Sequence, residues 1–264
     1  MQKIISWNVA SVRARMPALE KLLKQEQPDV VLLQEIKAEQ DTFPFLELQG
    51  LGYHCAISGQ KSYNGVAILS KEPLTAVQTA LPDFQDTEQP QARFVQATLP
   101  SGQKVISVYV PNGNPPEKDP ENKEKLAYKL KWMAALNKYV NQLLSSGEKI
   151  ILGGDFNVIE KDTDVYNPEA YRTNALMVDS VREKYAELNA LPLVNTIRLM
   201  NPEPHTYSFW DFQMRAWPLN RGMLLDALFV NASMEQQVSS AGILKQVRGW
   251  EKTSDHAPVF LILD

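Results

Sequence analysis

The chain has 264 residues, a formal net charge of −4 and a single cysteine. This length suffices for one large domain with a substantial apolar core, so neither a disulfide framework nor a structural metal is needed. The acidic balance argues against broad nonspecific affinity for nucleic acid, although a carboxylate-rich metal site contributes to it and a local basic rim can still hold phosphates.

Cys55 cannot form an internal disulfide, and we expect it to be a small buried hydrophobe in a protein of the reducing cytoplasm. The first residues show no signal-peptide pattern. No apolar run reaches the length that a transmembrane helix needs, so we expect no membrane association.

Apolar runs of strand length alternate with helix-patterned segments, which favours an α/β or layered α+β architecture. A helix is predicted over 17–27, where Leu19, Leu22 and Leu23 share one face. Ser101-Gly102 predicts a hairpin turn between two strands. In chain order, the predicted strands are 4–9, 30–34, 53–57, 65–70, 95–99, 104–110, 207–210, 227–230 and 259–263.

The longest helix signal follows Asp119-Pro120, a cap residue and a first-turn proline, and ends at Gly147. Its apolar residues recur every three or four positions, as in a stripe that packs on a core: Leu126, Leu130, Met133, Leu136, Val140 and Leu143. A further helix is predicted over 178–188, and 113–122, rich in proline and charge, is expected to be a surface loop. No linker or repeat interrupts the chain, so we expect one domain over 1–264.

Acidic side chains stand beside several of these apolar runs. Glu35, Asp155 and Asp255 lie at or next to the end of a run, and Asp226 directly precedes one. Carboxylate oxygens, with the amide oxygens of asparagines, suit Mg²⁺ or Mn²⁺, whereas three histidines without thiolates make zinc less suitable. Each acid taken alone also has a structural explanation, since a strand-entry carboxylate or a turn cap needs no ligand.

These acids belong to a series of short strings that runs along the whole chain. In this order, the strings resemble the exonuclease III-like AP endonucleases of the endonuclease/exonuclease/phosphatase superfamily. They are Trp7-Asn8-Val9, Ser11-Val12-Arg13-Ala14-Arg15, Gln34-Glu35-Ile36-Lys37, Asn64-Gly65-Val66-Ala67-Ile68, Tyr109-Val110-Pro111-Asn112-Gly113, Gly154-Asp155-Phe156-Asn157, Phe209-Trp210-Asp211 and Ser254-Asp255-His256-Ala257-Pro258.

The resemblance implies a four-layer α/β sandwich, DNase I-like, with two packed mixed β-sheets flanked by helices. It also implies a Mg²⁺-dependent DNA-repair phosphodiesterase, with Mn²⁺ as a substitute metal. Such an enzyme cuts 5′ to an abasic site and also removes 3′ blocking groups or nucleotides. Its partner is double-stranded DNA with abasic sites or blocked 3′ ends, and we expect a monomer.

The resemblance assigns the metal to Glu35, with Asn8 and Asp255 nearby. Asp155 then orients or deprotonates the attacking water, whose position Asn157 fixes. The phosphate oxygens receive hydrogen bonds from His256 and Asn157, Asp226 holds His256 protonated, and Tyr109 contacts the phosphate or assists the leaving group. The expected substrate contacts are Lys37, Asn112, Phe209, Trp210, Met223 and Leu225.

Within that last set, Phe209, Met223 and Leu225 are expected to form the apolar pocket for a flipped-out sugar that lacks its base. Trp210 either stacks on the substrate or packs in the core. His54 and His205 are interpreted as structural.

Two positions depart from the family pattern. The family has Arg-Ile-Asp where this chain has Leu224-Leu225-Asp226, so a cation near the pocket is lost. It has Asn or Asp where Ala10 follows Val9, which removes a polar group close to the metal. Two alternatives therefore stay open: a phosphoesterase of the same fold acting on RNA, nucleotides or phosphoinositides, or a catalytically weak protein that binds abasic DNA or DNA ends.

Overall fold

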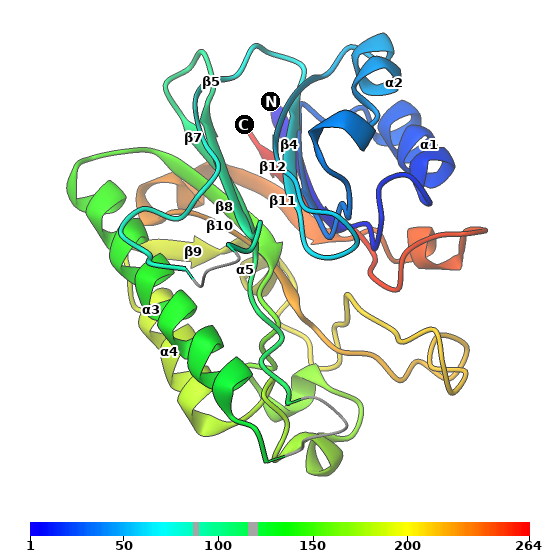
Figure 1. The fold of residues 1–264 in the computed structure, drawn as a ribbon, viewed down its shortest axis with the longest axis vertical. Helices are drawn as coiled ribbons and strands as arrows, with labels where there is room; N and C mark the ends of the chain where they lie inside the picture. The colour runs from blue at the N-terminus through cyan, green and yellow to red at the C-terminus, as the bar shows by residue number, and fades with distance from the viewer. Residues whose placement is uncertain (87–89, 116–120) are drawn as a thin grey trace.

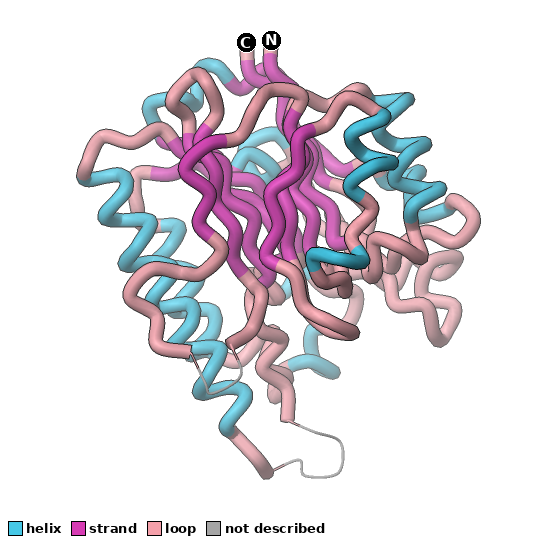
Figure 2. Tube along the Cα trace, turned by 45° about the horizontal axis from the view of Figure 1, so that its top comes forward, coloured by secondary structure: helices cyan, strands magenta, loops and turns pink. Residues whose placement is uncertain are grey.

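The computed structural model describes residues 1–86, 90–115 and 121–264. Two mixed β-sheets pack face to face, and helices cover their outer faces (Figure 1, Figure 2). The first sheet has the strand order β11-β12-β1-β2-β4-β3. Its strands are β1 (Gln2–Asn8), β2 (Val30–Gln34), β3 (His54–Ser58), β4 (Val66–Ser70), β11 (Val238–Ile243) and β12 (Val259–Leu263).

The second sheet has the order β5-β6-β7-β8-β10-β9. Within each sheet one pair is parallel, β1 with β2 and β7 with β8, and in both cases the connection between the two strands contains a helix. The other pairs are antiparallel. The strands are β5 (Thr75–Gln78), β6 (Phe94–Thr98), β7 (Lys104–Tyr109), β8 (Ile150–Asp155), β9 (Leu193–Asn195) and β10 (Asp226–Asn231).

The alternation of side chains along each strand produces three apolar layers. Ile4 faces the second sheet, in a cluster with Ile151 and Leu228, whereas its neighbour Ile5 packs with Leu19 and Leu22 on the outer face. The outer face of the first sheet is covered by α1 (Met16–Glu26) and α2 (Phe45–Gly50). That of the second sheet is covered by α3 (Glu124–Ser145) and α4 (Asp179–Asn189), while α5 (Thr196–Met200) contacts β10 and β11.

Most predicted elements are confirmed, including the hairpin at Ser101-Gly102 and the end of the long helix. Gly102 and Gly147 have φ values of +82° and +77°, the left-handed region that glycine adopts most easily. The helix starts at Glu124, where Asn122 accepts a hydrogen bond from its backbone N–H. The predicted Asp119-Pro120 start and part of the predicted 113–122 loop lie outside the described residues.

The predicted strand over 207–210 is wrong. Phe209 forms only isolated bridges, with Met223 and with His256, because this segment crosses the mouth of the sandwich instead of joining a sheet edge. Short or polar elements were not predicted: β5 is exposed along its whole length, and β9, β11, α2 and α5 lack a strong apolar pattern. Among the described residues, no helix is long and apolar enough to cross a membrane.

Candidate active site

The predicted site residues meet at one edge of the sandwich because strand register aligns their ends. Asn8 ends β1 opposite Gln34 of β2, so Glu35 follows at the same edge. In the second sheet, Asp155 pairs with Tyr109 on one side and with Asp226 on the other. The loop before β12 adds Asp255 and His256.

Asn8 joins the two sheets across this edge. Its amide nitrogen donates to Glu35 Oε1 at 3.0 Å and to Asp155 Oδ2 at 2.9 Å. Its amide oxygen accepts from the backbone N–H of Ala10 at 3.1 Å, which fixes the orientation of the amide. Asn8 therefore presents its nitrogen, not its oxygen, to the carboxylates, and in this arrangement it positions the carboxylate of Glu35.

Glu35 is the acid best suited to hold a cation. Burial by itself would raise its pKa, but hydrogen bonds from Asn8 and Lys37 hold that pKa below its usual value. Lys37 Nζ lies 2.8 Å from Glu35 Oε2. The carboxylate is thus ionised at neutral pH, and it is also part-exposed.

A buried acid–imidazole pair lies beside this carboxylate. His256 Nδ1 is 2.8 Å from Asp226 Oδ2, and His256 Nε2 is 3.7 Å from Asp155 Oδ2. Burial opposes the charge on His256, but Asp226 and Asp155 outweigh it and raise the pKa of the imidazole well above its usual value. Ser208 donates its hydroxyl to the same oxygen of Asp226, so two donors hold that carboxylate in place.

Asp155 lies at the centre of the cluster. Burial raises its pKa to about 7, with Asp226 adding to the effect and His256 opposing it. The backbone N–H of Asn157 donates to Asp155 Oδ1 at 2.9 Å, while Asn157 Nδ2 donates to Val110 O. Asn157 therefore orients the carboxylate through its backbone, from a left-handed conformation with φ +50°.

Tyr109 is held as a hydrogen-bond donor. Burial raises the pKa of its phenol well above the usual value, and the negative charges of Glu35 and Asp155 raise it further. The Arg93 guanidinium lies 4.8 Å from the centre of the Tyr109 ring and donates to its backbone oxygen at 3.2 Å. Arg93 was not predicted, since a single arginine before a strand carries no sequence signal.

The predicted apolar pocket residues do cluster. Met223 and Leu225 are buried and the half-buried Phe209 packs against them, its ring 4.9 Å from that of His256. Trp210 is fully buried and donates Nε1–H to Asn220, so of the two explanations for this residue, packing in the core fits the structure.

The two departures from the family pattern have clear structural settings. Leu224 points into the core between the sheets. A cation nevertheless lies close by, because Arg198 forms an ion pair with buried Asp164, next to Val165 of the apolar cluster. Ala10 has φ +47°, a conformation that Asn and Asp adopt more readily than Ala.

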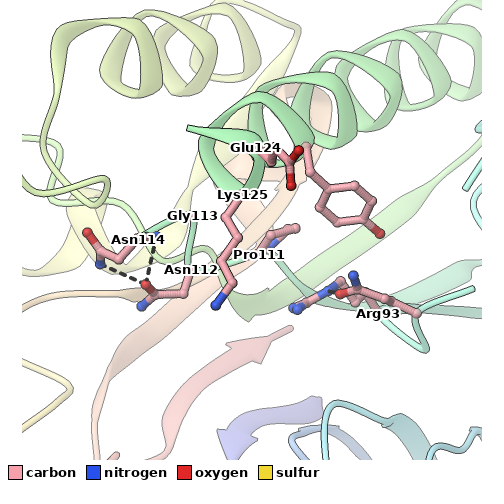
Figure 3. A pocket seen from close by; sticks show the side chains of 9 residues that line it. Arg93, Pro111, Asn112, Gly113, Asn114, Glu124 and Lys125 are labelled. Carbon is pink, nitrogen blue, oxygen red and sulfur yellow. Dashed lines mark hydrogen bonds between the residues drawn. The ribbon is translucent and has the colours of Figure 1, made fainter. Parts of the chain in front are cut away.

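Asn112 borders a cleft of about 320 Å³ beside the site (Figure 3). The side chains of Arg93 and Lys125 extend toward this space from the segment before β6 and from the start of α3. Asn112 is exposed, and its amide oxygen accepts hydrogen bonds from the N–H groups of Asn114. The cleft therefore continues the site along a rim that carries positive charge. Its lining residues are Gln91, Arg93, Pro111, Asn112, Gly113, Asn114, Glu124, Lys125 and Tyr128.

A metal fits the donor set at Glu35. In the described part of the chain, no three Asp, Glu, His or Cys side chains form a closed cage. Mg²⁺ needs no such cage, since it commonly takes one or two carboxylates, several waters and the substrate phosphate. Glu35 and the part-exposed Asp255 are the residues here that would hold it.

Comparison with known proteins finds relatives that match almost the whole chain. The chain is 31% identical to exodeoxyribonuclease III of Haemophilus influenzae, with 98% of each chain covered, and 32% identical to an exodeoxyribonuclease of Bacillus subtilis, with 99% of each covered. The 3′ phosphatase NExo from Neisseria, solved with a product DNA hairpin, superposes with a TM-score of 0.93 at 35% identity over 100% of both chains.

An AP endonuclease from Archaeoglobus fulgidus superposes with a TM-score of 0.92 at 29% identity, again over 100% of both chains. These likenesses confirm the DNase I-like four-layer sandwich that the resemblance implied. The sequence profile of the Endonuclease/Exonuclease/phosphatase family matches residues 5–256, and the chain therefore belongs to that family.

Proposed function

We propose that this protein is a Mg²⁺-dependent DNA-repair phosphodiesterase that cuts 5′ to an abasic site and also removes 3′ blocking groups or nucleotides. The observation that carries the proposal is the meeting of three groups at one sheet edge. Asn8 joins an ionised Glu35 to the buried Asp155 by hydrogen bonds, and His256 of the Asp226–His256 pair lies 3.7 Å from Asp155. Mn²⁺ is expected to substitute for Mg²⁺.

Glu35 and Asp255 are the residues that would hold the metal, which would supply neutralisation of charge on the scissile phosphate. Asp155, with a pKa near neutrality, takes a proton from the attacking water or orients it. The protonated His256, held by Asp226, donates to a nonbridging phosphate oxygen. Asn157 keeps Asp155 in place and donates to the phosphate, and the phenol of Tyr109 contacts the phosphate or the leaving oxygen.

The relatives support the choice of DNA as substrate, since their names describe exodeoxyribonucleases, a 3′ phosphatase bound to DNA and an AP endonuclease. Phe209, Met223 and Leu225 form the apolar surface for a sugar without a base, next to His256. Lys37 and Asn112 are also proposed to contact the DNA. We further propose a single domain that works as a monomer in the cytoplasm, where one unpaired cysteine is stable.

The test is cleavage of an end-labelled duplex that carries one central abasic analogue, with an intact duplex and a 3′-blocked duplex alongside, each with Mg²⁺ and with chelator. Incision at the analogue that chelator abolishes supports the proposal. Reaction of the 3′-blocked duplex alone identifies an end-cleaning enzyme. If no duplex reacts with either Mg²⁺ or Mn²⁺, the proposal fails in favour of RNA, nucleotide or phosphoinositide substrates, and chelator-resistant binding without cleavage would indicate a DNA-binding protein.

A further inference from the structure

Lys129 is a fully buried lysine on the apolar face of α3, in the second turn of the helix. Its ammonium donates to three backbone oxygens: Asn112 O at 3.1 Å, Asn157 O at 2.6 Å and Ala175 O at 2.9 Å. An ammonium group has three donors, so all three are satisfied. In the part of the chain that the structure describes, no carboxylate lies within ion-pair distance of this lysine.

The three acceptors come from three separate segments that end at the site. Asn112 follows β7, Asn157 follows β8, and Ala175 precedes α4. Asn157 in turn donates its backbone N–H to Asp155, so Lys129 lies two hydrogen bonds away from the proposed base. The Asn112 and Ala175 segments are joined a second time, because Asn114 bonds to Asn112, Asn174 and the N–H of Ala175.

The surrounding backbone is shaped to admit this side chain. Gly113 has φ +86°, and a Cβ at that position would meet Lys129 Cδ at 2.7 Å. A side chain at residue 113 would therefore displace the lysine. This close contact explains physically why a glycine ends the Val110-Pro111-Asn112-Gly113 string.

A buried ammonium without a carboxylate partner is costly. Burial lowers the pKa of Lys129 to about 7, although the negative charge of Asp155 favours the ammonium form. An apolar residue at this position of the stripe would avoid that cost. The lysine is thus better explained by the three loops that it joins than by the stability of the core.

We propose that Lys129 is a positioning residue, whose ammonium holds the three loops after β7, after β8 and before α4 in one fixed arrangement around the reacting phosphate. It acts through Asn157 and does not touch the substrate. The kinetic part of this inference rests on the proposed cleavage function, whereas the coupling of the loops does not.

The test compares Lys129→Met, which keeps the length of the stem, with Tyr139→Phe. Tyr139 lies on the same helix, is buried and donates its hydroxyl to Gln96 and Gln78, away from the site. Hydrogen–deuterium exchange is followed for peptides that cover 112–115, 157–159 and 174–176, with the thermal midpoint of each variant. Cleavage of the abasic duplex is measured in parallel.

Lys129→Met should speed exchange in all three segments and lower kcat by about 10²-fold, the cost of misplacing a reacting group by about 1 Å. KM should change less than kcat, and Tyr139→Phe should lose stability without either effect. Equal exchange in the two variants would overturn the inference, and so would three loosened loops with an unchanged kcat. If the wild type cleaves no duplex, the proposed function fails and the exchange data alone decide the coupling of the loops.

Should Lys129→Met not fold, Gly113→Ala displaces the same lysine while keeping its charge. The same three segments should then exchange faster. Faster exchange around residue 113 alone would count against the inference.

Discussion

Replacing Asp155 by Asn removes one negative charge from the centre of the site and changes the size of the side chain little. The carboxylate accepts from Asn157 N through Oδ1 and from Asn8 Nδ2 through Oδ2, and it lies 3.7 Å from His256 Nε2. An asparagine can keep the first contact but turns a donor toward Asn8. The variant therefore retains its fold but has no group that can accept a proton from water.

The expected loss in kcat is about 10²–10⁴-fold, the usual contribution of one general acid or base. This corresponds to roughly 3–5 kcal/mol of activation free energy. Single-turnover cleavage of the abasic duplex in Mg²⁺ measures it, and fluorescence anisotropy in chelator should show a Kd for DNA near that of the wild type. Asp29→Asn is the matched control, since Asp29 binds Lys3 N and Lys71 before β2, at the opposite end from Glu35.

A value of kcat within tenfold of the wild type would refute the role of Asp155 as base. A parallel loss of DNA affinity would instead place its contribution in binding. A large fall in the thermal midpoint, not shared by the Asp29→Asn control, would mean that the carboxylate is structural.

The remaining predictions concern four other positions. His256→Ala should lower kcat nearly as much as Asp155→Asn, with little change in DNA binding; turnover close to that of the wild type would remove this residue from the mechanism. Arg198→Met leaves Asp164 buried without its ion-pair partner and should lower the free energy of unfolding, measured by urea denaturation, by about 3–5 kcal/mol. A decrease of less than about 1 kcal/mol would contradict this prediction. Ala10→Asn should raise that free energy by about 1 kcal/mol, because Asn tolerates φ +47° better; an unchanged midpoint argues against strain at this residue. Burial raises the pKa of Cys55 to about 12, so less of this thiol is ionised in the native protein. At pH 8, Cys55 should therefore react with iodoacetamide roughly 1000-fold more slowly in the native than in the unfolded protein, and the native rate should increase with pH. Fast labelling of the native protein at pH 8 would show that the thiol is accessible.

The alternation of apolar residues predicted strands and helices, and the resemblance carried by the order of motifs implied the fold and the candidate site residues. Strands such as β2 and β8 are buried on both faces and appear in the sequence as continuous apolar runs. The acids at their ends were predicted to converge, and strand register brings Asn8, Glu35, Asp155 and Asp226 to one edge.

Other features had no such pattern. The apolar run over 207–210 has the pattern of a strand, but Phe209 forms only isolated bridges to Met223 and His256, and Trp210 packs in a separate apolar cluster with Ala216 and Ala257. Lys129 could have been noticed in the sequence, because it lies on the same helix face as Met133 and Leu136, where an apolar residue is expected.

In the sequence by itself, local periodicity indicated alternating strands and helices, and the resemblance carried by the order of motifs implied the sandwich architecture and the candidate site residues, because both patterns can be seen without coordinates. Tertiary structure alone decided which atoms face one another. The amide nitrogen of Asn8 faces Glu35 and Asp155 because its amide oxygen accepts a hydrogen bond from the backbone N–H of Ala10. Arg93 and Lys129 contact residues that are distant in the chain. Such contacts depend on how separate segments pack, and no single segment of the sequence carries that information.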